Sequence, residues 1–307
     1  MSQLIPAFDF NRVFVEPWTN GFSTYGWMLL MAFLVTATCG LIGNYLILRR
    51  MALVGDAISH SVLPGLAVAY LFTGALTLPV MLAGALGAGL LATVLIEFIH
   101  TRSRIKADAA IGITFCTLFA LGVVLINVFA SRVHLDAECV LYGELEYVAS
   151  KPPVGLAGWS LAPQPVLIMA CVGTVVAVSI AVFYKELLLS SFDESLAASL
   201  GFAPKVIHLA LMAMLSIVIV SAFESVGAIL VIAMLILPGA TSQLISTRLP
   251  VCLWLSVLHA ALSAVLGLHL ALALGCSMAA AVVVAGAGLF VLVWMLGPGG
   301  LLRGGRA

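Results

Sequence analysis

The chain has 307 residues, of which 63% are hydrophobic and only 8% are charged, and its formal net charge is zero. Soluble domains carry about 25% charged residues, so this composition indicates a protein that crosses a membrane several times. The absence of a basic excess excludes nucleic acid as a partner, and the first residues lack the basic segment of a cleaved signal peptide.

Nine apolar stretches are long enough to cross a bilayer, which takes roughly 20 mostly apolar residues. In chain order they are 25–47, 52–72, 76–99, 108–130, 164–184, 206–223, 225–246, 250–273 and 276–296. The sixth and seventh are short and are separated only by Glu224, so they form either two spans or one broken span. The sequence therefore predicts an all-α polytopic membrane protein with eight or nine transmembrane helices. Pro64-Gly65 and Pro238-Gly239 mark two places where a span is interrupted.

The distribution of basic residues predicts the orientation, because cytoplasmic loops are enriched in Lys and Arg. With nine spans and the N-terminus outside, ten of the 13 basic residues lie on the inner side. They are Arg49, Arg50, Arg102, Arg104, Lys106, Lys185, Lys205, Arg248, Arg303 and Arg306. We therefore expect an outer segment at 1–24, a transmembrane domain at 25–296 and a cytoplasmic tail at 297–307.

One ionisable pair lies near the start of the second predicted span. Asp56 and His60 are four residues apart, so one face of a helix carries both side chains. An ionisable residue inside a membrane span costs about 3 kcal/mol and suggests a functional site. A carboxylate oxygen and an imidazole nitrogen are ligands that a divalent transition metal accepts, so the pair predicts metal passage. The alternatives are that Asp56 only caps the helix and that His60 is a buried histidine bonded to a backbone carbonyl.

Two connections are long enough to have a function of their own. The outer one, 131–163, is either a vestibule that attracts cations or an ordinary solvated loop, and its relevant side chains are His134, Asp136, Glu138, Glu144 and Glu146. In the inner one, 185–205, Asp193 can cap a short helix that Gly201 and Pro204 end. Such a helix either lies on the membrane or docks a partner, and its few positive charges favour the partner.

The other ionisable residues of the spans have less specific interpretations. Glu224 lies either at the outer surface or at a secondary cation site in the pore mouth. His259 and His269 are ten residues apart in one span, and we expect buried, hydrogen-bonded histidines. Glu97 and His100 are interpreted as interfacial residues whose polar ends reach toward water.

The run from Arg49 to Gly65, with Gly-Asp-Ala-Ile-Ser-His at 55–60, resembles the signature of permease subunits of manganese, zinc and iron ABC importers, the ABC-3 type metal permeases. Shorter stretches agree with this family in order and spacing over most of the chain, namely 104–112, 189–201 and 226–238. The outer segment from His134 to Glu144 is most similar to the manganese branch.

This resemblance implies an all-helical permease of the bacterial inner membrane, with its N-terminus outside and its C-terminus in the cytoplasm. Its partners would be a second permease (a copy or a paralogue), two ATP-binding cassette ATPase subunits and a solute-binding protein that delivers Mn²⁺, Zn²⁺ or Fe²⁺. No permanently bound cofactor is implied. The family's metal-coordinating positions fall on Asp56 and His60. Its ATPase-coupling helix falls on 190–201, with contacts at Ser191, Phe192, Asp193, Glu194, Leu196, Leu200 and Gly201.

Other functions remain as alternatives. The chain contains no Gly-Lys pair and hence no Walker A loop, so any ATPase must be a separate polypeptide and the chain is not expected to be an enzyme. A permease for a metal chelate, such as a siderophore or a corrinoid, has no need of the Asp56 and His60 pair. An ATP-independent carrier has no need of a docking helix at 190–201.

Overall fold

The computed structural model describes residues 9–19, 21–74, 78–129, 143, 145–156 and 159–297. Its nine long helices are α1 (Phe22–Leu48), α2 (Val54–Thr73), α3 (Leu78–Arg102), α4 (Ala107–Phe129), α6 (Gln164–Val182), α9 (Pro204–Val226), α10 (Ala228–Ile245), α11 (Leu249–Leu274) and α12 (Met278–Leu296). The short helices are η1 (Asn11–Val15), η2 (Glu16–Trp18), η3 (Leu145–Ser150), α7 (Tyr184–Phe192) and α8 (Glu194–Ser199). Strands β1 (Pro153–Leu156) and β2 (Trp159–Pro163) pair antiparallel.

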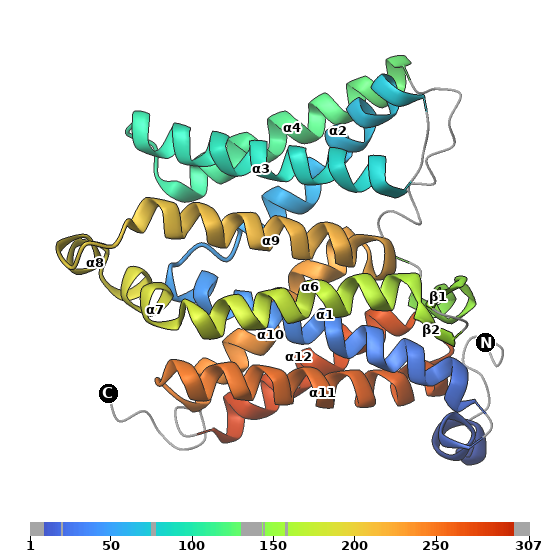
Figure 1. Cartoon of the computed structure of the whole chain (residues 1–307). Helices are drawn as coiled ribbons and strands as arrows, with labels where there is room; N and C mark the ends of the chain where they lie inside the picture. The colour runs from blue at the N-terminus through green and yellow to red at the C-terminus, as the bar shows by residue number, and fades with distance from the viewer. Residues whose placement is uncertain are drawn as a thin grey trace.

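A long helix occupies each of the nine predicted ranges. Among the described residues, eight helices are long and apolar enough to span a membrane, and the apolar part of α10, Leu230–Ile245, is shorter. The break between α9 and α10 lies at Gly227, whose positive φ of 81° ends α9, and therefore not at Glu224 as predicted. After this break α10 leads back to the end of the bundle at which α11 begins (Figure 1). The all-α polytopic fold is confirmed.

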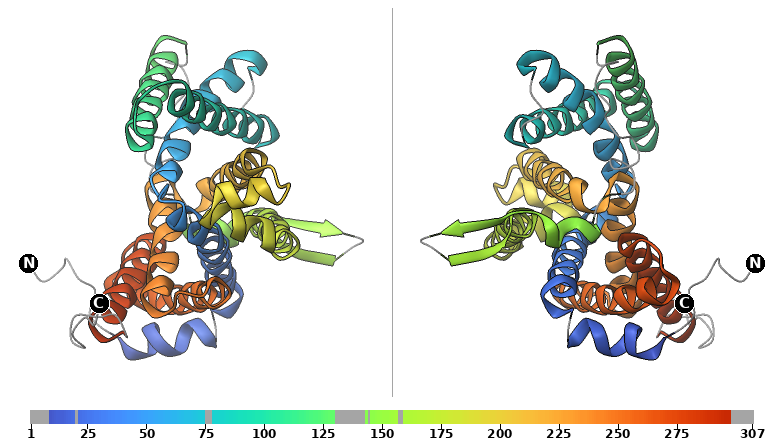
Figure 2. Two further views of the ribbon diagram at one scale, coloured as in Figure 1. Left: turned by 90° about the vertical axis from the view of Figure 1, so that its left-hand side faces the viewer. Right: turned by 90° about the vertical axis from the view of Figure 1, so that its right-hand side faces the viewer.

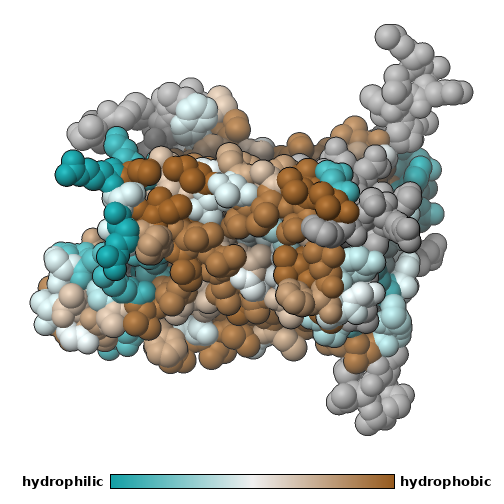
Figure 3. Space-filling model, turned by 90° about the horizontal axis from the view of Figure 1, so that it is seen from above, coloured by the Kyte–Doolittle hydropathy of each residue, from teal (hydrophilic) through white to brown (hydrophobic). Residues whose placement is uncertain are grey.

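The helices run roughly parallel to one another, so the molecule has two ends. The α1–α2 turn, α7, α8 and the end of α12 lie at the left of Figure 1, and η1, η2 and the hairpin β1–β2 lie at the right. Hydrophobic side chains fill the middle of the face seen in Figure 3, while hydrophilic residues gather toward its two ends. This distribution matches an apolar bilayer core between two polar interfaces.

Two features at the right-hand end of the bundle in Figure 1 were not predicted from the sequence. The hairpin β1–β2 extends sideways from the bundle, as Figure 2 shows. Residues of η1 and η2 lie across the bundle and contact α11, where the Val13 carbonyl oxygen is 2.8 Å from Nδ1 of His269. The ring of Phe14 stacks on the same imidazole, with 4.9 Å between the ring centroids.

Helix α1 forms the centre of the larger part of the bundle, packing against α6, α9, α10 and α11. Its fully buried Asn44 donates from Nδ2 to Oγ of Ser256 on α11 (2.7 Å) and accepts at Oδ1 from Oγ of Ser242 on α10 (3.0 Å). A buried amide is costly unless it is hydrogen-bonded, so this network fixes the register of three helices.

Helices α2, α3 and α4 form a separate group, which joins the rest chiefly through contacts of α2 and α3 with α9 and of α2 with α10 (Figures 1 and 2). Pro64 lies inside the continuous helix α2, and Pro238 lies inside α10, so neither Pro-Gly pair breaks its helix as the sequence had suggested. At Gly122 of α4 an added Cβ would lie 2.8 Å from the Pro64 nitrogen, so the glycine admits the proline ring between α2 and α4.

Gly43 offers a test of this packing, because α1 and α10 approach closely at this residue. A Cβ built there would collide with the carbonyl oxygen of Leu235. We expect Gly43→Ala to force the helices apart and to lower stability by about 1–3 kcal/mol, the usual cost of overpacking. Thermal unfolding of the detergent-solubilised chain measures this.

The matched control is Gly288→Ala on α12, where the added Cβ meets no atom within 4 Å. Its unfolding temperature should equal or exceed that of the unaltered chain, because Ala is the better helix former. Equal unfolding temperatures for the two variants would contradict the proposed close crossing.

Candidate functional site

Asp56 and His60 lie on one face of α2 and contact each other. Asp56 lies in the first turn of the helix, with Leu53 in the N-cap position. Nε2 of His60 is 3.3 Å from Oδ1 of Asp56. The structure therefore brings together the two residues that the sequence singled out, and the interpretation of Asp56 as a simple N-cap is wrong.

Helix α4 supplies an aromatic wall behind this pair. The ring centroid of His60 lies 4.8 Å from that of Phe115 and 5.5 Å from that of Phe119. The two polar side chains are still partly accessible, with 20% of His60 and 38% of Asp56 exposed. The aromatic rings limit the orientations of the imidazole and leave the carboxylate the more accessible of the two.

The pair offers one carboxylate and one imidazole to a ligand. Within the part of the chain that the structure describes, no group of three or more His, Cys, Asp or Glu side chains is arranged to hold a metal ion. Stable divalent sites take four or more ligands, counting waters. A metal ion at Asp56 and His60 therefore needs donors beyond these two side chains, and no further His, Cys, Asp or Glu among the described residues joins them.

The remaining sequence candidates lie apart from this pair. Glu224 is part of α9, three residues before the break at Gly227. His269 contacts the N-terminal segment through the Val13 carbonyl, in line with a hydrogen-bonded histidine. His259 is buried as expected, but its Nε2 atom has no hydrogen-bond partner among the described residues.

Four of the five candidate side chains of the predicted outer vestibule lie outside the described residues, namely His134, Asp136, Glu138 and Glu144. Glu146 is described, and its Oε1 atom accepts a hydrogen bond from the backbone N–H of Met278 (3.2 Å). Met278 is the first residue of α12, so Glu146 caps that helix and attaches η3 to it.

The predicted helix at 190–201 is interrupted. Helix α7 ends at Phe192 and α8 begins at Glu194, because Asp193 has extended backbone angles between them. The predicted capping role of Asp193 is confirmed, since its Oδ1 atom accepts from the backbone N–H groups of Ser195 (2.9 Å) and Leu196 (3.0 Å). The prediction of a single helix over 190–201 is therefore wrong, because Asp193, which caps the start of α8, also ends α7.

Three large apolar side chains of this segment are exposed. Phe192 is 62% exposed, Leu196 46% and Leu200 59%. The segment turns at Gly201, where φ is 89°, a conformation that favours glycine. Hydrogen bonds from the Ser195 hydroxyl and the Leu196 amide lower the pKa of the Asp193 carboxyl, so the cap persists at neutral pH and is lost only as the pH falls through that lowered pKa.

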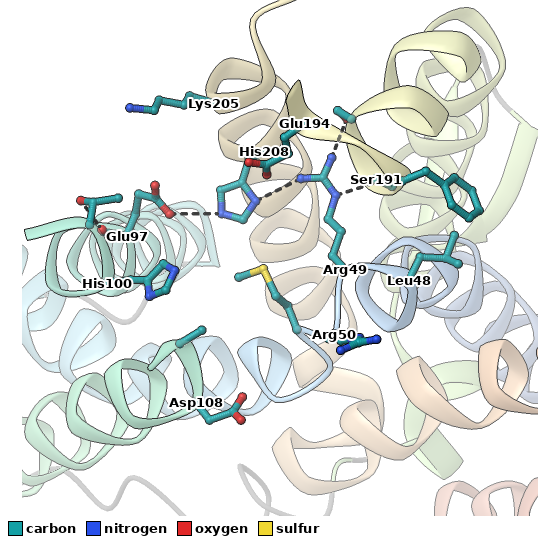
Figure 4. A pocket seen from close by; sticks show the side chains of 15 residues that line it. Leu48, Arg49, Arg50, Glu97, His100, Asp108, Ser191, Glu194, Lys205 and His208 are labelled. Atoms are coloured by element: carbon teal, nitrogen blue, oxygen red, sulfur yellow. Dashed lines mark hydrogen bonds and ion pairs between the residues drawn. The ribbon is translucent and has the colours of Figure 1, made fainter. Parts of the chain in front are cut away.

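A polar cluster that the sequence analysis missed lies beside this segment (Figure 4). Arg49 contacts Ser190, Ser191 and His208, and Nε2 of His208 is 3.6 Å from Oε2 of Glu97. Glu97 therefore faces a partner rather than only reaching toward water. No motif in the apolar stretch around His208 points to this cluster. The one signal that could have singled it out is that an ionisable residue lies within a predicted span.

Known proteins resemble this chain over most of its length. The model of the ABC 3 transport family matches residues 22–297. The manganese transport system membrane protein MntD of Bacillus subtilis (strain 168) is 43% identical over 255 residues, covering 83% of this chain and 86% of the relative. The zinc transport system membrane protein TroD of Treponema pallidum (strain Nichols) is 40% identical over 271 residues, covering 88% of this chain and 73% of the relative.

A solved structure shares both the fold and the sequence pattern. The structure of PsaBC from Streptococcus pneumoniae in complex with Fab superposes with a TM-score of 0.73 at 35% sequence identity, covering 89% of this chain and 91% of the other. A family match over most of the chain, relatives above 30% identity and this superposition agree with one another. The chain belongs to the ABC 3 transport family.

Proposed function

We propose that this chain is the membrane-spanning permease subunit of an ATP-driven importer of a divalent transition metal, Mn²⁺, Zn²⁺ or Fe²⁺. The observation that carries the proposal is the contact between Asp56 and His60 on α2. Family membership and the manganese and zinc transport names of its relatives support the same class of cargo.

The donor chemistry fits a transition metal. Imidazole nitrogen suits zinc and iron, and carboxylate oxygen suits manganese. The two donors do not choose among these metals, since Zn²⁺ accepts both and Mn²⁺ or Fe²⁺ accepts them with added water. Because one chain offers only two protein ligands, a single permease would hold its ion weakly.

A second permease would complete the site. Another copy of this chain, or a paralogue, related by a twofold axis would contribute a second carboxylate and a second imidazole. Four protein donors satisfy a tetrahedral Zn²⁺ or, with water, a higher-coordinate Mn²⁺. The exposed fraction of Asp56 and the peripheral place of α2–α4 in Figure 1 leave room for such a partner.

The remaining partners follow from energy coupling and delivery. The chain has no Walker A loop, so two ATP-binding cassette subunits would supply ATP hydrolysis, and α7–α8 would dock on them through exposed Phe192, Leu196 and Leu200. A solute-binding protein would deliver the metal at the opposite end. The permease would lie in the bacterial inner membrane with α7–α8 and the end of α12 on the cytoplasmic side, as the basic residues favour.

Substitution of the paired residues tests the metal site. We expect Asp56→Asn and His60→Gln each to reduce metal uptake by about tenfold or more, because a loss of about 1.4 kcal/mol in binding is already tenfold. Uptake of radioactive Mn²⁺ or Zn²⁺ by cells that express the complete transporter measures this. Asp9→Asn is the control. It removes an exposed carboxylate near the N-terminus, far in sequence from Asp56, and should transport normally.

Membrane levels of each variant are compared by immunoblot, so that lost insertion is not mistaken for lost transport. Wild-type uptake in either Asp56→Asn or His60→Gln would remove the proposed role of the pair.

Cross-linking tests the docking of α8. In a background without the six native cysteines, Leu196→Cys should cross-link to the ATPase subunit, because Leu196 is exposed on α8. Val175→Cys, which is exposed on the middle of α6, should not cross-link. Labelling of Leu196→Cys by a membrane-impermeant reagent from outside the cell would overturn both the docking and the orientation.

A further inference from the structure

A polar cavity of about 610 Å³ lies at the end of the bundle that carries α7 and α8. Its walls come from the α1–α2 turn, the end of α3, the start of α4, the helices α7 and α8, and the first turns of α9. Figure 4 shows Arg49 near the centre of the view, with its guanidinium directed toward α7 and α9. Several structural elements thus meet at one side chain.

The guanidinium of Arg49 makes three contacts with its neighbours. Nη2 donates to Oγ of Ser190 (2.7 Å), and Nε donates to Oγ of Ser191 (3.1 Å), both on α7. Nη1 is 3.2 Å from Nδ1 of His208 on α9. Burial lowers the pKa of the Arg49 guanidinium and the charge of Glu194 on α8 opposes this shift, so the group remains a cation that faces the start of α8.

The contact with Arg49 determines which nitrogen of His208 carries the proton. A guanidinium only donates hydrogen bonds, so Nδ1 of His208 must accept, and the ring proton of the neutral imidazole lies on Nε2. Nε2 faces Oε2 of Glu97 at 3.6 Å. The donors of this cluster therefore all face the same way: Arg49 donates to His208, and the Nε2–H of His208 faces Glu97. The cluster connects the end of α1 with α9 and α3.

Arg49 is joined to α2 by a stiff turn. The N–H of Arg50 bonds to the carbonyl of Ile47 (3.0 Å), and the N–H of Met51 bonds to that of Leu46 (2.9 Å). With φ of 57° at Arg50, these bonds form a Schellman motif that ends α1. A left-handed conformation is costly for a residue other than glycine, so surrounding contacts must hold the turn in place. Asp56 follows only seven residues after Arg49.

We propose that Arg49 is a positioning residue that transmits movement of the docking helices α7–α8 to the metal-binding turn of α2. Ser190 and Ser191 attach α7 to the guanidinium, and the rigid α1–α2 turn carries any displacement of Arg49 to Asp56. The cluster with His208 and Glu97 holds α9 and α3 to the same point. This role rests on the proposed function, because it links ATP hydrolysis to the metal site.

The first experiment measures the ratio of metal transported to ATP hydrolysed by the complete transporter in proteoliposomes. In Arg49→Gln this ratio should fall about tenfold or more, because losing even one hydrogen bond from a charged group is worth about that factor and Arg49 makes three contacts. ATP hydrolysis should stay within about twofold. Ser190→Ala combined with Ser191→Ala should lower the ratio as well. Arg49→Lys should give a ratio between those of Arg49→Gln and the unaltered transporter, since lysine keeps the charge but lacks the planar fork of the guanidinium.

Lys205→Gln is the matched control, because Lys205 lines the same cavity but points away from Arg49 in Figure 4. It should leave the ratio unchanged. An unchanged ratio in Arg49→Gln would overturn the proposal. This includes the case in which uptake and hydrolysis fall by the same factor, which would indicate a merely structural role.

Hydrogen–deuterium exchange of the same purified complex tests the proposal independently of transport. Arg49→Gln should speed exchange both in α7–α8 and in residues 54–60, and Lys205→Gln should change neither. Faster exchange in α7–α8 alone would show that the two elements are not connected through Arg49. If the unaltered complex shows no ATP-dependent metal uptake, the proposed function fails, whereas the exchange result still decides the role of Arg49.

Discussion

The cost of placing polar groups inside an apolar bundle is the constraint on which this structure depends. A polar side chain within a membrane-sized helix is costly without a partner, because neither lipid nor an apolar core replaces the hydrogen bonds of water. Asn44 meets this need with Ser242 and Ser256, and so fixes α1 against α10 and α11. The pairing of Asp56 with His60 meets the same need on α2 but leaves both groups partly accessible.

These two sets of contacts differ in how completely the polar groups are enclosed and hydrogen-bonded. The amide of Asn44 is fully enclosed, with both of its polar atoms hydrogen-bonded, so it stabilises one arrangement of helices. The Asp56–His60 contact is incomplete, because two donors are too few for a divalent ion and the carboxylate remains open. The Arg49 cluster lies between these extremes, since it is well connected but borders a cavity where movement is possible. Under the proposed function, movement would involve α2, α7 and α8, while the hydrogen bonds of Asn44 hold the central helices together.

The sequence allowed much of the fold to be predicted, because long apolar stretches and the one-turn spacing of Asp56 and His60 are local signals. The break at Gly227 was misplaced at Glu224, since helix α9 tolerates an acidic residue near its end. The division of 190–201 escaped prediction although Asp193 was identified as a cap, because a cap can also terminate the helix before it. His208 was missed altogether: its contact with Arg49 joins residues 159 positions apart, and no local pattern encodes such a pairing.

Pulsed electron paramagnetic resonance of Mn²⁺ bound to the complete transporter tests the central claim, that Asp56 and His60 hold the cargo, most directly. With ¹⁵N-labelled histidine in this chain, the account predicts a nitrogen coupling to manganese that shows the ¹⁵N signature and disappears in His60→Gln. The substitution Asp9→Asn should leave that coupling intact. A manganese spectrum without histidine nitrogen, or a nitrogen coupling that persists in His60→Gln, would contradict the account.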